Sequence, residues 1–227
     1  MSPSIAKWYE KEYGLSSVIV LRNTPESSKV ICRNRVFNDI FHIPENDLIF
    51  IYQGVINTGR GIELLNKVFS QVSFEKHLVV MGYGPLVGIV KEAAESTPNI
   101  HFLPAVSPQE IAHYTSGADV GLCMIENVSL SYYYCLPNKL FEYLHNGLPV
   151  IVSNFPDMVS IVKGFDCGWI SDLSTEQLII LVNSISADAL KEKRRGVMQA
   201  RTEINWEKES ELLIQAFPHI RKYDYSF

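Results

Sequence analysis

The chain has 227 residues, of which 47% are hydrophobic, and its 20 basic and 25 acidic side chains give a formal net charge of −5. This size and apolar content suffice for a full core, either one large α/β domain or one domain with an appendage. The acidic balance excludes a general basic surface for nucleic acid, so any phosphate site must be local. The densest basic run, KEKRR at 191–195, predicts a solvated helix face.

Other protein classes are excluded by specific residue patterns. The four cysteines form no C-x-x-C pair, which favours a reduced, cytoplasmic protein over a disulfide framework. The histidines lack metal-ligand spacing, so we expect neither a metal nor another cofactor. The N-terminal residues do not form a signal peptide, and no apolar stretch approaches the roughly 18 residues that a transmembrane segment needs.

The predicted elements begin with a short helix over 3–13, a strand over 16–23 and a linker over 24–29. Apolar runs of strand length then alternate with helical patterns. Most of these runs are continuously apolar, as expected of parallel strands that helices cover on both faces. The six strands of this sheet are predicted at 48–53, 77–82, 100–104, 119–125, 148–153 and 167–171.

Repeated βα units of this length predict an α/β fold, a Rossmann-like doubly wound parallel sheet. We expect residues 47–205 to form this domain. Residues 1–46 are interpreted as the remnant of a preceding domain plus a linker. Residues 206–227 are predicted to form a C-terminal helix with an amphipathic pattern.

The loop after the first strand of the sheet, GVINTGRG at 54–61, is a candidate phosphate site. Its glycines, Gly54 among them, allow close approach of a ligand to the backbone, and Arg60 lies where the next helix begins. A helix N-terminus together with an arginine suits an anion. An ordinary βα turn with a surface arginine is the alternative interpretation.

The stretch LPNKLFEYLHNG at 136–147 predicts a helix with an unusual first turn. Lys139 would oppose the helix dipole there, and a bound anion would relieve that conflict. Glu142, one turn further, could then accept hydrogen bonds from sugar hydroxyls. Asn138, Glu142 and His145 are predicted to share a polar stripe opposite the apolar face. A surface Lys–Glu pair is the alternative.

A second glycine pair occurs in MGYGP at 81–85, after the next strand, but G-x-G-x-x-G is absent. The turn is interpreted either as admitting the base or sugar of a ligand or as a plain turn.

In this order, the segments resemble the C-terminal, donor-binding half of GT-B glycosyltransferases, especially the retaining family 4, also called glycosyl transferases group 1. The matching segments are FIYQGVINTGRGIELLNKVF, LVVMGYGP, IHFLPAVSPQEIAHYTSGADVGLCMI and LPNKLFEYLHNGLPVIVSNFPDM. The resemblance implies a transferase that uses a nucleoside diphosphate sugar as donor. It also implies a glycan or lipid-linked acceptor, a role in polysaccharide biosynthesis and an N-terminal acceptor domain that precedes this half.

The resemblance also implies roles for individual residues. Gly54, Arg60 and the backbone at Asn138, Lys139 and Leu140 would contact the diphosphate, and Glu142 would bind the ribose. The nucleoside would lie beside Gly82, Tyr83 and Val106. The chain departs from the family pattern at Val55, where an arginine is frequent, and at Tyr134, where a glutamate normally touches the transferred sugar. Tyr134 or a neighbouring tyrosine, or Glu126, is the candidate substitute.

The family usually carries its catalytic histidine in the N-terminal domain, so no catalytic residue is assigned and this chain alone is expected to be inactive. A GT-B-type sugar-nucleotide epimerase and a non-catalytic nucleotide-binding or assembly module stay open as alternatives. We expect a cytoplasmic location. Peripheral association of the full-length enzyme with the inner face of the membrane is an open alternative.

Overall fold

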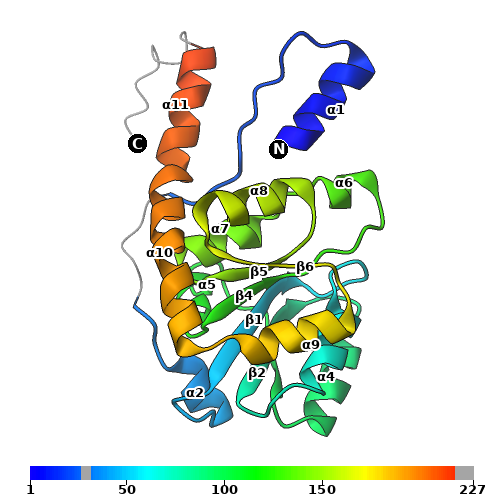
Figure 1. The fold of residues 1–227 in the computed structure, drawn as a ribbon, viewed down its shortest axis with the longest axis vertical. Helices are drawn as coiled ribbons and strands as arrows, with labels where there is room; N and C mark the ends of the chain where they lie inside the picture. The colour runs from blue at the N-terminus through cyan, green and yellow to red at the C-terminus, as the bar shows by residue number, and fades with distance from the viewer. Residues whose placement is uncertain (27–31, 218–227) are drawn as a thin grey trace.

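The computed structural model describes residues 1–26 and 32–217. Within this part of the chain, six parallel strands form one sheet in the order β3-β2-β1-β4-β5-β6 (Figure 1). They are β1 (Leu48–Val55), β2 (Lys76–Tyr83), β3 (Ile100–Pro104), β4 (Val120–Cys123), β5 (Val150–Ser153) and β6 (Gly168–Ser171). The Rossmann-like, doubly wound fold class predicted from the sequence is therefore confirmed, as are all six of its strands.

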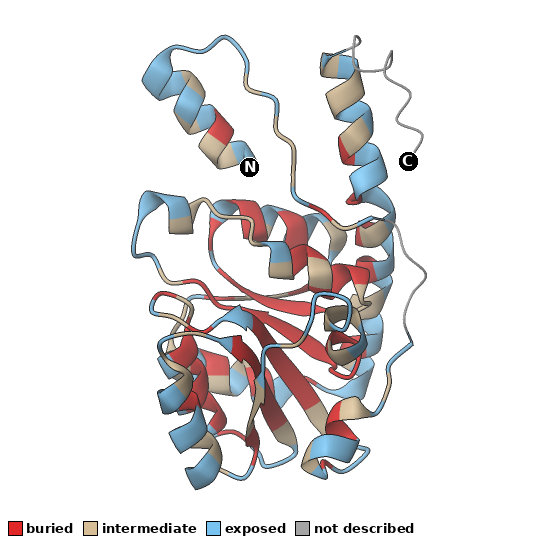
Figure 2. Ribbon diagram, turned by 180° about the vertical axis from the view of Figure 1, so that it is seen from behind, coloured by how far each residue is buried: buried red, intermediate tan, exposed pale blue. Residues whose placement is uncertain are grey.

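Helices cover both faces of this sheet, and each face has its own apolar core. On one side lie α2 (Val36–Phe41), α7 (Asn138–His145), α8 (Pro156–Phe165) and α10 (Ala187–Glu203). On the other lie α3 (Ile62–Phe69), α4 (Val87–Ser96) and α9 (Thr175–Ser184). Figure 2 shows the buried residues concentrated in the strands and the inward faces of these helices. Burial on both faces explains why the strands are continuously apolar in sequence.

The sheet opens between β1 and β4. The paired register between these strands includes Phe50↔Val120 and Ile51↔Gly121, whereas β1 and β2 pair along their whole length up to Val55↔Tyr83. The strand order also reverses here, because the chain runs from β1 outward to β3 and then returns to β4. Such a switch point in a parallel sheet is where ligands bind, beyond the carboxyl ends of the strands.

A glycine in β4 brings α7 close to this opening. A Cβ on Gly121 would lie 2.3 Å from the ring of Tyr143, so only glycine allows the tyrosine to lie on the sheet. The Tyr143 hydroxyl in turn accepts a hydrogen bond from the Gln53 N–H at 2.9 Å. The helix is thereby tied to the end of β1, which brings its first turn to the switch point.

Two helices near the ends of the described chain do not pack on either face of the sheet. Helices α1 (Pro3–Tyr13) and α11 (Trp206–Ala216) project beyond it on the side of α7 and α8 (Figure 1). The chain between α1 and residue 26 is extended, so the strand predicted over 16–23 is wrong. Its backbone is held by side chains: Glu10 accepts from the Val18 N–H at 3.0 Å, and Glu209 accepts from the Arg22 N–H at 2.8 Å.

Some predictions for the ends lie partly outside the described residues. This applies to the end of the linker at 24–29 and to the end of the C-terminal helix, whereas the helix over 3–13 is confirmed. The domain limits at residues 47 and 206 stay predictions. Among the described residues, no helix is long and apolar enough to cross a membrane.

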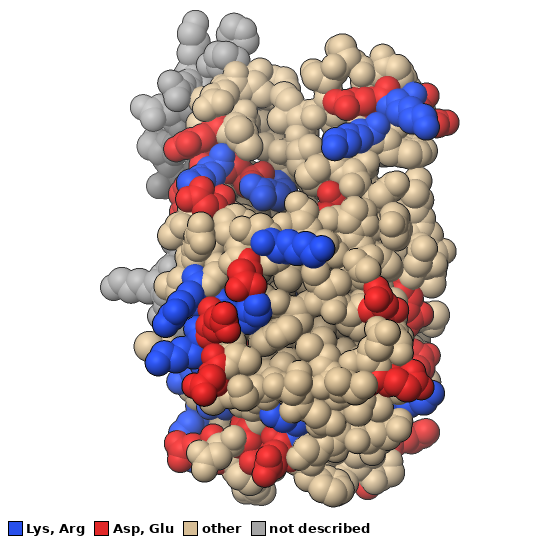
Figure 3. Space-filling model, viewed as in Figure 1, with Lys and Arg blue, Asp and Glu red and all other residues tan. Residues whose placement is uncertain are grey.

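The basic run at 191–195 lies on α10, where acidic and basic side chains are interleaved (Figure 3). Lys193 pairs with Asp166, and Arg194 pairs with Asp119 at 3.2 Å. The run is thus part of a mixed-charge helix surface.

Candidate functional site

A cavity of about 510 Å³ opens at the switch point, beside the first turn of α7. Eight of the ten predicted site residues line it, namely Gly54, Arg60, Gly82, Tyr83, Val106, Asn138, Lys139 and Glu142. Leu140 and Tyr134 do not. The fold therefore brings together residues from separate βα loops, although the role of each stays a prediction.

Lys139 is the most unusual residue of the cavity wall. Its ammonium is enclosed and has no hydrogen-bond partner among the described residues. It lies 3.6 Å from the centroid of the Tyr52 ring, and a Cβ on Gly54 would lie only 3.9 Å from it. Burial lowers the pKa of Lys139 to about 8. A buried cation without a partner is costly, which indicates a site for an anionic ligand.

Arg60 supplies a second cation to the cavity wall. Its guanidinium carbon lies 4.6 Å from the centroid of the Tyr132 ring, which gives the charge an aromatic platform. The backbone at Gly59 packs directly against this ring, because a Cβ there would lie 2.9 Å from it. The tyrosine stands in α6 (Leu130–Tyr133), a single turn within the long loop after β4.

The first turn of α7 provides backbone donors beside Lys139. Pro137 is its N-cap, and the exposed Asn138 is the first helical residue. The first N–H groups of a helix have no intrahelical acceptor. The Leu140 N–H, which was predicted to contact the diphosphate, already donates to the Pro137 carbonyl at 3.0 Å, and the Leu140 side chain is buried in the core. Asn138 and Lys139 are therefore the better backbone donors.

Glu142 is held by a residue that the sequence interpretation missed. Gln53, at the end of β1, donates from its amide nitrogen to Oε2 of Glu142 at 2.5 Å. The Thr115 hydroxyl lies 2.7 Å from the Gln53 amide oxygen and donates to it. A glutamine within an otherwise apolar strand was the signal in the sequence, because a buried polar side chain requires partners.

The predicted nucleoside side of the cavity lies along the ends of β2 and β3. A Cβ on Gly82 would lie 1.9 Å from the Gly54 carbonyl oxygen, so glycine is required for the two strands to approach here. Tyr83 is 63% exposed at the mouth of the cavity, and Val106 is half-buried in the loop after β3. This side offers an exposed aromatic ring and backbone groups to a flat ligand.

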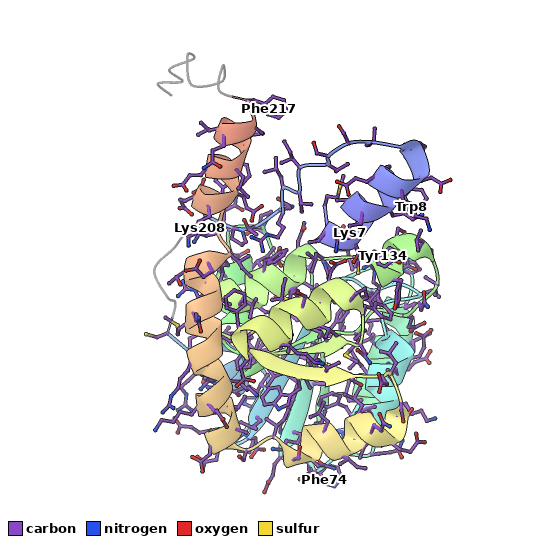
Figure 4. All side chains as sticks on the ribbon, turned by 45° about the horizontal axis from the view of Figure 1, so that its top comes forward. Lys7, Trp8, Phe74, Tyr134, Lys208 and Phe217 are labelled. Atoms are coloured by element: carbon purple, nitrogen blue, oxygen red, sulfur yellow. The ribbon has the colours of Figure 1, made fainter. Side chains whose placement is uncertain are left out.

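Three further residues singled out from the sequence lie outside the cavity wall. Tyr134 follows α6 and lies at the α1 end of the molecule, away from Phe74 at the other end (Figure 4). The Glu126 carboxylate accepts from the Gly61 N–H at 3.2 Å and so ties the loop after β4 to the glycine loop. His145 is buried and bonds to the Ile204 carbonyl at 2.7 Å, so its place in an open polar stripe is wrong.

Cys135 also lines the cavity, and burial raises the pKa of its thiol to about 11, which keeps it protonated. In the described part of the chain, no cluster of three or more histidine, cysteine, aspartate or glutamate residues is arranged to hold a metal ion. The charged residues among those that line the cavity in the described structure are Arg60, Lys139 and Glu142.

The sheet order and the cavity at its switch point define a Rossmann-like α/β domain of the kind found in GT-B glycosyltransferases. The chain belongs to the family described as glycosyl transferases group 1, which matches residues 47–188. No curated protein matches the chain.

Solved structures show the same fold at low sequence identity. The sucrose-phosphate synthase of Thermosynechococcus elongatus is 19% identical with a TM-score of 0.76, covering 98% of this chain and 57% of that chain. WaaG, a glycosyltransferase involved in lipopolysaccharide biosynthesis, is 17% identical with a TM-score of 0.65, covering 89% and 56%. HepE of Anabaena, in complex with UDP-glucose, is 10% identical with a TM-score of 0.72, covering 88% and 57%. This chain spans little more than half of each.

Proposed function

We propose that this chain is the donor-binding half of a retaining glycosyltransferase, which transfers a hexose from a nucleoside diphosphate sugar to a glycan or lipid-linked acceptor. The observation that carries this proposal is the enclosed ammonium of Lys139 at the switch-point cavity, which has no hydrogen-bond partner among the described residues. A diphosphate there would partner the ammonium and take hydrogen bonds from the first N–H groups of α7.

The cations would act when the bond between sugar and diphosphate breaks. Negative charge then grows on the departing diphosphate, and Arg60 and Lys139 both line the cavity that would hold it. Donors and cations fixed in advance stabilise such charge without reorganising, which is the main source of rate acceleration in this kind of step. In this proposal the two side chains supply the charge, and no metal is required.

Glu142 would select the nucleoside. Its carboxylate can accept hydrogen bonds from two neighbouring ribose hydroxyls, whereas pyrophosphate offers no such donor. The exposed ring of Tyr83 would lie beside the base. HepE was solved with UDP-glucose, which makes the uridine nucleotides a suitable first set of probes.

The acceptor site and the catalytic base would come from an N-terminal domain, so this chain alone would bind the donor without transferring sugar. A non-catalytic nucleotide-binding module is the second candidate, and Tyr134, outside the cavity and in the place of a glutamate, favours it. The two differ in one measurement: only a glycosyltransferase half should transfer sugar once joined to an N-terminal acceptor domain.

Isothermal titration calorimetry with UDP-glucose, UDP and pyrophosphate tests the donor site. We expect all three to bind the parent, UDP more tightly than pyrophosphate, and Glu142→Ala to reduce that preference by removing the ribose contact. Arg60→Ala should weaken all three. If none of these compounds, nor the corresponding ADP and GDP sugars, binds at millimolar concentration, the proposal is wrong.

A further inference from the structure

We propose that Gln53 is a positioning residue that holds Glu142 toward the donor cavity and thereby sets the preference for a nucleoside diphosphate over a bare diphosphate. This inference rests on the proposed function of Glu142. Gln53 lines the cavity, but its amide nitrogen is already engaged, because it donates to Glu142 Oε2 at 2.5 Å. Its effect on the ligand would therefore pass through the Glu142 carboxylate.

The orientation of the Gln53 amide follows from its neighbours. If its oxygen faced Glu142, two acceptors would lie 2.5 Å apart, so the amide must present its nitrogen to the carboxylate. The amide oxygen then accepts from the Thr115 hydroxyl at 2.7 Å. The backbone is fixed as well, because the Gln53 N–H donates to the Tyr143 hydroxyl at 2.9 Å.

The Glu142 side chain could adopt a second orientation, away from the donor cavity. Besides the donor cavity it lines a second cavity of about 170 Å³, formed with Asn138 and the extended segment Asn23 to Pro25. The hydroxyl of Thr24 is buried beside that space and has no hydrogen-bond partner among the described residues. A glutamate released by Gln53 would therefore find a donor on the wall of the second cavity.

Gln53 removes this freedom by engaging one carboxylate oxygen. Oε2 is committed to the amide, so Oε1 and the remaining lone pair of Oε2 are left for ribose hydroxyls. An acceptor fixed in advance saves the ordering cost that a mobile carboxylate would meet on binding. The consequence is specific to ligands with a ribose, because pyrophosphate does not meet Glu142.

The test is a double-mutant cycle between Gln53→Met and Glu142→Ala, with UDP and pyrophosphate as probes in calorimetry. Methionine keeps the length and volume of the side chain and removes its donor and acceptor. We expect Gln53→Met to weaken UDP binding about tenfold and leave pyrophosphate binding unchanged. In the Glu142→Ala background the same substitution should change neither affinity, since coupled residues are not additive.

Thr24→Val is a second variant for the same cycle. Removing the alternative partner should restore part of the UDP affinity that Gln53→Met loses. Gln71→Met is the matched control, because Gln71 is exposed and its amide donates to the Lys67 carbonyl at 2.9 Å, on the surface of the domain. It should leave both affinities unchanged.

The outcomes distinguish a failure of the role proposed for Gln53 from a failure of the donor site itself. If the parent prefers UDP, Glu142→Ala reduces the preference and Gln53→Met leaves it at the parent's level, the role of Gln53 is refuted while the donor site stands. If Gln53→Met weakens both probes equally, Gln53 serves packing alone and the inference is also refuted. If the parent shows no preference for UDP, the ribose role of Glu142 fails, and this inference fails with it.

Discussion

At the scale of single residues, Lys139 carries a stability cost that the proposed diphosphate ligand would offset. Its ammonium lies against the Tyr52 ring, and this contact only partly replaces lost hydration, because burial still lowers its pKa to about 8. A cationic group whose pKa is lower in the folded than in the unfolded state destabilises the fold while it is charged in both. The burial of Lys139 is therefore better explained by the anionic ligand it would bind than by a contribution to stability.

Lys139→Met should stabilise the free protein and weaken its ligand binding. Methionine has similar length and no charge to bury, so we expect the melting temperature to rise by a few degrees, about 1 kcal/mol corresponding to roughly 2–4 °C at this size. Pyrophosphate and UDP should both bind about 10- to 100-fold more weakly. Differential scanning calorimetry and titration calorimetry measure the two effects.

Lys91→Met is the control for this change. Lys91 is exposed on α4, with its ammonium 5.5 Å from the centroid of the Phe102 ring. The substitution should leave the melting temperature and both affinities essentially unchanged. A Lys139 variant that is less stable than the parent, yet binds pyrophosphate equally well, would show that Lys139 serves the fold.

The same pKa predicts a pH dependence with a definite sign. Below about pH 8 Lys139 is charged in both states and its full penalty applies; above its usual value of 10.5 it is neutral in both. The stability advantage of Lys139→Met over the parent should therefore shrink as the pH rises through this window. Urea unfolding of both proteins at several pH values measures it, and an advantage that grows with pH would contradict the assignment.

The site could be predicted from the sequence where residues depart from local rules. Lys139 stands out as a cation at a helix N-terminus, and Glu142 as the carboxylate one turn later. Gln53 acquires its role only when β1 meets α7, because its partner Glu142 is 89 positions away in the sequence and no local pattern shows that contact. His145 was misplaced because helical periodicity places a side chain on a face without showing that the chain after α10 covers it.

At the scale of elements, glycines decide how closely the strands and helices approach around the cavity. Gly82 lies where a Cβ would meet the Gly54 carbonyl oxygen at 1.9 Å, and Gly121 lies under the Tyr143 ring. Gly82 belongs to the glycine pair in MGYGP that the local sequence shows, whereas Gly121 stands inside an apolar strand with no such signal. The six strands could be predicted because burial on both faces leaves a continuous apolar run. The segment 16–23 carries a similar run and forms no strand, because its backbone bonds to side chains.

Gly82→Ala and Gly88→Ala are a matched pair that tests this close approach. The first should destabilise the protein by several kcal/mol, because the added methyl would displace backbone at the ends of β1 and β2. The second adds a methyl in open space on the helix α4, so it should stabilise by up to about 1 kcal/mol. Chemical denaturation gives both values, and equal effects would contradict the close approach of these strands.

At the scale of the whole molecule, polar contacts join the extended segment before the Rossmann-like domain to α11. Glu209 of α11 is fully buried and holds Arg22 through a 2.6 Å bond to its Nε and a 2.8 Å bond to its N–H. The Trp206 N–H donates to the Pro25 carbonyl at 3.0 Å. This clamp fixes the extended segment beside α7, where Asn23 and Thr24 form a wall of the second cavity.

Glu209→Gln should loosen this clamp without disturbing the sheet. The amide cannot match the charge of Arg22, and breaking one side of a buried pair costs about 3–5 kcal/mol when both partners are enclosed, less here because Arg22 is 26% exposed. Hydrogen exchange followed by mass spectrometry should show faster exchange in residues 15–25 and in α11, with β1 and β4 unchanged. Glu203→Gln removes an exposed partner of Lys208 and should change nothing measurable, since surface pairs contribute little. Faster exchange throughout the sheet in Glu209→Gln would mean that the clamp belongs to the cooperative core, so that α11, the extended segment and the Rossmann-like domain unfold as one unit.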